Sequence, residues 1–110
     1  MKWYVIDEIN KTDLAAIKNY LKQRLSPSGL ENILWLKLPD LHYNALQKTH
    51  KECAPFFIAT ELGADWIRFE LFVRSMKTMG CECCSFCDPP QVEWIIAEAE
   101  DICCKWCMFH

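Results

Sequence analysis

The sequence predicts an α+β fold, with a single-layer, mainly antiparallel sheet of about four strands and helices packed on one face. Three observations predict it. Segments with hydrophobic residues at every second position alternate with segments that repeat them every three or four residues. A glycine-containing connection at residues 63–65 suits an antiparallel hairpin. The composition is 52% hydrophobic and 25% charged, which is ordinary for a globular protein.

The first half of the chain contains two expected strands and two expected helices. Residues 2–8 favour a strand, and Asn10 or Thr12 can cap a helix that runs to about Leu25. Its apolar positions share one face, namely Leu14, Ile17, Leu21 and Leu25. The Pro and Gly of residues 26–29 end that helix. Residues 32–38 then form a strand with leucine at alternate positions, and a short helix is expected over residues 41–52.

The second half contains a hairpin and a helix. Strands over residues 56–62 and 66–74 complete the sheet, and in the second of them hydrophobic and charged residues alternate. For the last helix, residues 89–107, Asp88 is a good N-cap and Gln91 stands three positions beyond it, as in a capping box. The expected element order is therefore β-α-β-α-β-β-α, in a single domain over residues 1–110.

Charge and hydropathy exclude several classes of protein. Residues 1–80 carry 11 Lys and Arg against 9 Asp and Glu, whereas residues 81–110 carry one Lys against six acids. The cations do not cluster as a nucleic-acid interface requires, so no nucleic-acid partner is expected. No stretch approaches the length of a membrane span, and the first residues do not resemble a signal peptide. We therefore expect a cytoplasmic protein with no membrane partner.

Cysteine is the most unusual feature of the composition, with 8 residues in 110. Four lie in the loop at residues 80–88, and we predict them as metal ligands: Cys81, Cys83, Cys84 and Cys87. Soft thiolates favour zinc or an iron–sulfur cluster. The common iron–sulfur spacings are missing, so zinc is the leading cofactor. The carboxylates of Glu82 and Asp88 would keep metal-free thiols protonated, and a cation would relieve the repulsion among thiolates.

Further cysteines and one histidine are secondary candidates for the same site. Cys107 lies on the last helix, and a His50-x2-Cys53 pair could be brought to the site by the fold. Cys103 belongs to the apolar stripe of the helix and is better explained as packing. The roles of Cys104 and His110 stay open.

Two other functions remain as alternatives to metal binding. The Cys84-x2-Cys87 pair could act in thiol–disulfide exchange or redox sensing, because a helix N-terminus favours a thiolate at Cys87. The chain could instead be a non-catalytic interaction module with reduced cysteines, which would dimerise through the sheet face or the hairpin. None of the common catalytic motifs is present, so an enzyme is the less favoured interpretation.

Overall fold

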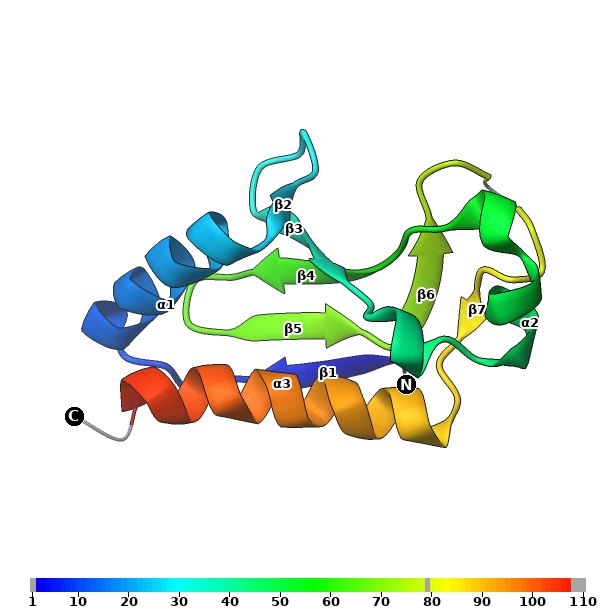
Figure 1. The fold of residues 1–110 in the computed structure, drawn as a ribbon. Helices are drawn as coiled ribbons and strands as arrows, with labels where there is room; N and C mark the ends of the chain where they lie inside the picture. Colours follow the sequence, from blue (N-terminus) through cyan, green and yellow to red (C-terminus); the bar gives the residue numbers. More distant parts are fainter. Residues whose placement is uncertain (1, 79, 108–110) are drawn as a thin grey trace.

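The computed structural model describes residues 2–78 and 80–107, without the side chains of residues 103–107, and has an α+β fold (Figure 1). Within these residues the chain forms seven strands, three α-helices and two short 3-10 helices. The strands are β1 (Trp3–Ile6), β2 (Ser26–Pro27), β3 (Ile33–Lys37), β4 (Phe56–Leu62), β5 (Ile67–Glu70), β6 (Phe72–Ser75) and β7 (Ser85–Phe86). The helices are α1 (Lys11–Arg24), α2 (Ala45–Thr49) and α3 (Pro89–Cys107), with 3-10 helices η1 (Asp40–His42) and η2 (Lys51–Cys53).

The prediction of a single-layer sheet of about four strands, in the element order β-α-β-α-β-β-α, is wrong. The described residues form a seven-stranded antiparallel sheet, in which β1, β5, β4, β3 and β2 are neighbours in that order, and β6 pairs with both β4 and β7. The two added strands β2 and β7 have two residues each. Strands this short give no hydrophobic alternation, so the pattern along the chain could not indicate them.

A bend at Leu71 divides the strand that was expected over residues 66–74. Thr60 pairs with Phe69 in β5, whereas Phe56 pairs with Ser75 in β6, so two extra residues enter the second strand between these points. The Leu71 amide donates to the Lys2 carbonyl at 2.7 Å, beside the pair of Trp3 and Glu70 at the end of β5. An insertion of this kind bends a strand and increases its twist. It turns β6 toward the cysteine-rich loop.

The helical segment expected over residues 41–52 is also broken, into η1, α2 and η2. The side chain of Asn44 accepts a hydrogen bond from the Gln47 amide at 2.8 Å, and the Gln47 side chain accepts one from the Asn44 amide at 3.0 Å. This capping box starts a new helix at Ala45. A capping residue satisfies amides that would otherwise lack a partner, and so interrupts a longer helix at that point.

The core lies between the sheet and the two long helices. Helices α1 and α3 lie side by side and cover the same face of the sheet (Figure 1). Helix α1 contributes Leu14, Ile17 and Leu21, and strand β4 is buried at every second residue. Burial of these side chains is the main term that stabilises the fold.

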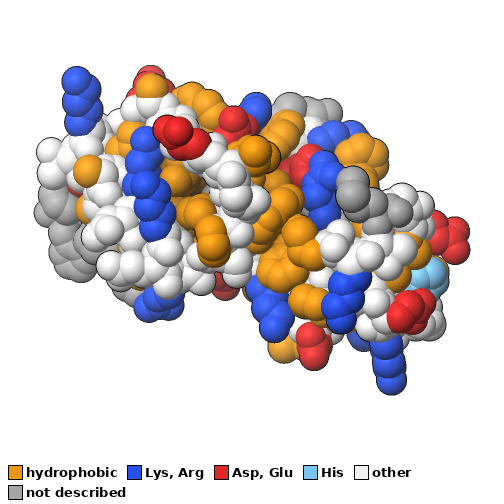
Figure 2. Space-filling view, turned by 90° about the horizontal axis from the view of Figure 1, so that it is seen from above, with side chains coloured by type: hydrophobic (Ala, Val, Ile, Leu, Met, Phe, Trp, Pro, Cys, Tyr) orange, Lys and Arg blue, Asp and Glu red, His pale blue; other side chains and the backbone are white. Residues whose placement is uncertain are grey.

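The other face of the sheet carries aromatic side chains that are only partly buried. The Arg68 guanidinium lies 4.1 Å from the ring centre of Trp3 and 5.2 Å from that of Trp66. Figure 2 shows a band of hydrophobic side chains across one face of the molecule, between the α1 end and the α2 end.

Among the described residues, no helix has both the length and the apolar composition to cross a membrane.

We predict that truncation of Leu21, in the core of the structure, destabilises the fold. Leu21 is fully buried, so Leu21→Ala should lower the free energy of unfolding by about 2–5 kcal/mol. The matched control is Leu41→Ala, at a leucine that is 76% exposed, which should change it by less than about 0.5 kcal/mol. Urea denaturation followed by circular dichroism measures both, and equal effects would contradict the described packing.

Candidate metal centre

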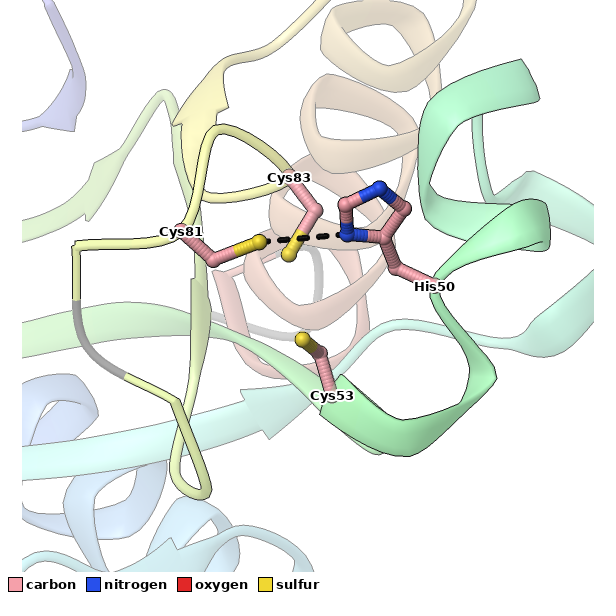
Figure 3. A group of neighbouring side chains, drawn as sticks. All are labelled: His50, Cys53, Cys81 and Cys83. Carbon is pink, nitrogen blue, oxygen red and sulfur yellow. Dashed lines mark hydrogen bonds between the residues drawn. The ribbon is translucent and has the colours of Figure 1, made fainter.

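Four side chains that can hold a metal ion meet at the end of the molecule where α2 lies (Figure 3). His50 and Cys53 come from the segment of α2 and η2, whereas Cys81 and Cys83 come from the loop between β6 and β7. Their four ligand atoms all lie within 4.8 Å of one another. The cluster therefore joins two segments that are about thirty residues apart in the chain.

Local helical hydrogen bonds set the positions of His50 and Cys53. The His50 amide donates to the carbonyls of Leu46 at 3.1 Å and Gln47 at 3.2 Å, which ends α2. The Cys53 amide then donates to the His50 carbonyl at 3.0 Å. Residues three apart in a 3-10 turn lie on the same side, so both side chains face the loop.

A tight turn sets the positions of Cys81 and Cys83. Gly80 has a φ of +79°, a conformation that side-chain-bearing residues rarely adopt. The Cys84 amide donates to the Cys81 carbonyl at 2.9 Å and closes the next turn. Cys81 is consequently partly exposed, while Cys83 is fully buried.

A buried pair of glutamines fixes the backbone at Cys83. Gln47 Nε2 donates to the Cys83 carbonyl at 3.1 Å, and Gln47 Oε1 accepts from Gln91 Nε2 at 2.8 Å. Gln91 Nε2 also donates to the His42 carbonyl at 3.0 Å. Gln47 and Gln91 are 0% and 1% exposed. Because buried amides are costly to leave unpaired, this network favours one arrangement of α2, α3 and the loop.

Ser75, the last residue of β6, holds the other side of the cluster. Its hydroxyl donates to the Cys53 carbonyl. The same oxygen accepts from the amides of Lys77 at 3.1 Å and Thr78 at 3.2 Å. One buried side chain thus connects η2 to the start of the loop that carries Cys81.

The thiols of the cluster differ in their protonation. Hydrogen bonds from the Cys83 amide and the Cys83 thiol lower the pKa of Cys81 to about 7. Burial raises the pKa of Cys83, and its contacts with Cys81 and Cys53 raise it further. His50 Nδ1 lies 3.1 Å from Cys81 Sγ. Cys81 is therefore the thiol of the pair that ionises first, with Cys83 as its hydrogen-bond donor.

The arrangement is suited to a metal ion. Zinc–sulfur bonds of about 2.3 Å in a tetrahedron place the sulfur atoms about 3.8 Å apart. The ligand atoms here lie within 4.8 Å, so small side-chain adjustments bring all four onto one ion. None of the five cysteines whose side chains the structure describes forms a disulfide, so the three thiols of the cluster are free to bind.

The structure brings together some of the predicted ligands and separates others. Cys81 and Cys83 are in the cluster with the secondary candidates Cys53 and His50. Cys84 lies outside it, with Sγ accepting from the Ser75 amide at 3.3 Å. Cys87 is also outside it, and its amide donates to the Leu71 carbonyl at 3.1 Å.

The remaining candidates are on the last helix or beyond it. The 19 residues of α3 span about 28 Å, and the helix ends at the opposite end of the molecule from α2 (Figure 1). The side chains of Cys103, Cys104 and Cys107, and all of His110, lie outside the described residues.

The sequence alone did not indicate that Gln47 and Ser75 support the site, or that Gln91 is the buried partner of Gln47. The signal for Gln47 was available, because Asn44 three residues earlier gives the capping-box spacing. Gln91 was recognised as a capping residue, and its side chain does accept from the Asp88 amide at 3.2 Å. Its contact with Gln47 spans 44 residues, and no local pattern indicates it.

The expectation that the α3 N-terminus favours a thiolate at Cys87 is wrong. Burial, together with the carboxylates of Asp88 and Glu70, raises the pKa of Cys87 to about 12. These effects outweigh the helix dipole, which is a weaker interaction. The Cys84-x2-Cys87 pair thus lacks the activated thiol that the redox interpretation assigned to Cys87.

No protein-family model, curated protein or solved structure matches this chain. The residues and geometry of the site itself therefore carry the functional argument.

We predict that the glutamine pair supports the metal centre. Gln47→Met keeps the length of the side chain but removes the partners of the Cys83 carbonyl and the Gln91 amide. It should lower the free energy of unfolding by about 3 kcal/mol, because buried polar groups lose their hydrogen bonds. It should also weaken binding of a metal ion at the candidate site about tenfold or more, as does the loss of residues that hold metal ligands in place. Chemical denaturation and competition with a zinc chelator measure the two effects.

The control is Gln23→Met on the exposed side of α1. It makes the same chemical change without touching the network, so both quantities should stay at wild-type values. Unchanged zinc affinity in Gln47→Met would contradict the supporting role.

We also predict that Cys81 and Cys87 differ in reactivity. In reduced, metal-free protein at about pH 8, iodoacetamide should label Cys81 before Cys87, because the thiolate is the nucleophile and the Cys87 pKa is raised. Mass spectrometry of peptides after timed labelling gives both rates. Under full denaturation the difference should disappear, and faster labelling of Cys87 in the folded protein would refute the assignment.

Proposed function

We propose that this chain is a small zinc-binding protein whose ion is held by His50, Cys53, Cys81 and Cys83. One observation carries the proposal. Four donor atoms from two separate segments lie within 4.8 Å of one another, with no disulfide among the cysteines described there. Three sulfurs and one imidazole nitrogen are a common ligand set of tetrahedral structural zinc sites.

The donor set supports zinc over other common metals. Thiolate and imidazole ligands favour zinc, whereas calcium and magnesium prefer oxygen. A [2Fe–2S] or [4Fe–4S] cluster usually takes four thiolates. In this group one of the four donors is a histidine, so a single zinc ion fits better than a cluster.

The proposed role of the ion is structural. Four protein ligands fill a tetrahedral shell and leave no position for a substrate, which is typical of structural sites. The ion would connect η2 to the loop after β6, where Cys53 and Cys83 are buried. A divalent charge would also offset the repulsion among three thiolates in this small volume. Free thiols of this kind persist in a reducing compartment, which supports a cytoplasmic protein.

We predict one zinc ion per chain and its loss on removal of a ligand. Protein purified under reducing, anaerobic conditions should bind about one equivalent of zinc, measured by atomic emission after chelator-free dialysis. Cobalt substitution should give the absorption of a tetrahedral thiolate site. Zinc at about a thousand times its dissociation constant should stabilise the fold by about 4 kcal/mol. Cys81→Ser should abolish stoichiometric binding.

Cys84→Ser is the matched control, since this cysteine lies in the same loop but outside the cluster. It should keep the full equivalent of zinc. Bound zinc should protect Cys53, Cys81 and Cys83 from alkylation and leave Cys84 unprotected. Absence of stoichiometric zinc in the wild-type chain would overturn the proposal, and protection of Cys84 and Cys87 with a labelled Cys53 would instead assign the ion to the loop alone.

A further inference from the structure

A cavity of about 470 Å³ opens beside the metal centre. Strand β3 contributes Trp35 to its wall, and strand β6 contributes Phe72 and Ser75. The loop contributes two cysteines to the same wall, Cys81 and Cys84. A small molecule that enters from solvent therefore meets one proposed ligand of the ion and one further thiol.

Cys84 is held close to Cys81 by the backbone. The hydrogen bond from the Cys84 amide to the Cys81 carbonyl, 2.9 Å long, closes a four-residue turn. The Cα atoms at the two ends of such a turn lie less than about 7 Å apart. Disulfides join Cα atoms that are about 4.4–6.8 Å apart, so this backbone suits a bond between the two residues.

The Cys84 thiol is available for reaction. Its sulfur accepts from the Ser75 amide at 3.3 Å and donates to the Thr78 carbonyl at 3.6 Å. Both are weak hydrogen bonds to the backbone, and neither involves the metal ligands. In zinc-loaded protein, Cys84 would remain a thiol while the three cysteines of the cluster are bound to the ion.

We propose that Cys81 and Cys84 are a redox pair that controls the metal site: a hydroperoxide converts them to a disulfide, and the ion is released. The proposal rests on the zinc-binding function above. It assigns to Cys84 a role in regulation of the site, and it identifies the cavity as the route by which the oxidant arrives.

The chemistry balances with the hydroperoxide as oxidant. The sulfur of Cys81 attacks the peroxide, the O–O bond breaks, and a sulfenic acid forms with release of water or an alcohol. The sulfur of Cys84 then attacks the sulfenic sulfur, the S–O bond breaks, and water leaves as the disulfide forms. Two electrons pass from the two sulfurs to the peroxide. The ion loses its Cys81 ligand and dissociates as a divalent cation.

The other described cysteines are poorer partners for Cys81. Cys53 and Cys83 are 2% and 0% exposed, and both would be bound to the ion when the oxidant arrives. Cys87 is not in the cavity wall, and its backbone is bonded to Leu71. Among the described cysteines other than Cys81, only Cys84 combines access from the cavity, a free thiol and a turn that joins it to Cys81.

The test uses the full chain loaded with zinc and treated with hydrogen peroxide under anaerobic conditions. Zinc release is followed with a colorimetric chelator, and disulfides are mapped by mass spectrometry after alkylation of the remaining thiols. We expect release of the bound zinc together with a Cys81–Cys84 disulfide. Dithiothreitol with added zinc should restore the loaded protein.

Two variants separate the pair from its neighbours. Cys84→Ser keeps all four proposed ligands, so it should load zinc normally, form no Cys81 disulfide and release zinc about tenfold more slowly, because the intramolecular partner is lost. Cys84→Ala tests the same loss without a hydroxyl. Cys87→Ser is the control, and it should behave as the wild type.

Distinct outcomes overturn each proposal. A Cys53–Cys81 or Cys84–Cys87 disulfide, or release from Cys84→Ser at the wild-type rate, would refute the redox pair even if zinc is bound. Failure of the reduced wild type to bind zinc would refute the metal site. In that case the peptide map of metal-free protein still reports whether Cys81 and Cys84 pair.

Discussion

The contact between the side-chain amides of Gln47 and Gln91, 2.8 Å long and fully buried, is the interaction on which the rest of this end of the molecule depends. Each glutamine also closes the capping box of its own helix, so the contact fixes the start of α2 relative to the start of α3. Gln47 then holds the Cys83 carbonyl, which places the buried thiol. Helix capping, helix packing and ligand position are therefore coupled through two amide groups, and none can change without leaving a buried polar group unpaired.

The candidate metal centre depends equally on the register of the sheet. His50 and Cys53 precede β4, and Cys81 and Cys83 follow β6, so the two halves meet because Phe56 pairs with Ser75. The bend at Leu71 makes this pairing possible, since an uninterrupted strand would keep the register seen between Thr60 and Phe69. An irregularity in the sheet thus positions the candidate site, which is a common use of bulges.

The elements that depend on residues close together in the chain were predicted correctly from the sequence. The first and last helices and strand β4 follow from periodicity and capping residues, and Asn10 and Asp88 do cap their helices. Strand β2 pairs with residues nearby in the chain, but its two residues are too few to give a pattern. The division of the strand at Leu71 and the short β7 depend on pairing between residues distant in the chain, so local patterns do not indicate them. The same holds at the site. Clustering along the chain pointed to Cys84 and Cys87, whereas the fold brings in Cys53 and His50. The single domain and the homodimer through the sheet face or hairpin stay predictions.

The separation of the two ligand pairs along the chain has a consequence for biosynthesis. A ribosome that has delivered His50 and Cys53 must add about thirty further residues before the second pair exists, which takes a few seconds at about 5–20 residues per second. During that interval the nascent chain would carry only half of the proposed site. Under the proposed function, metal capture would therefore be a late event that follows closure of the hairpin in the correct register.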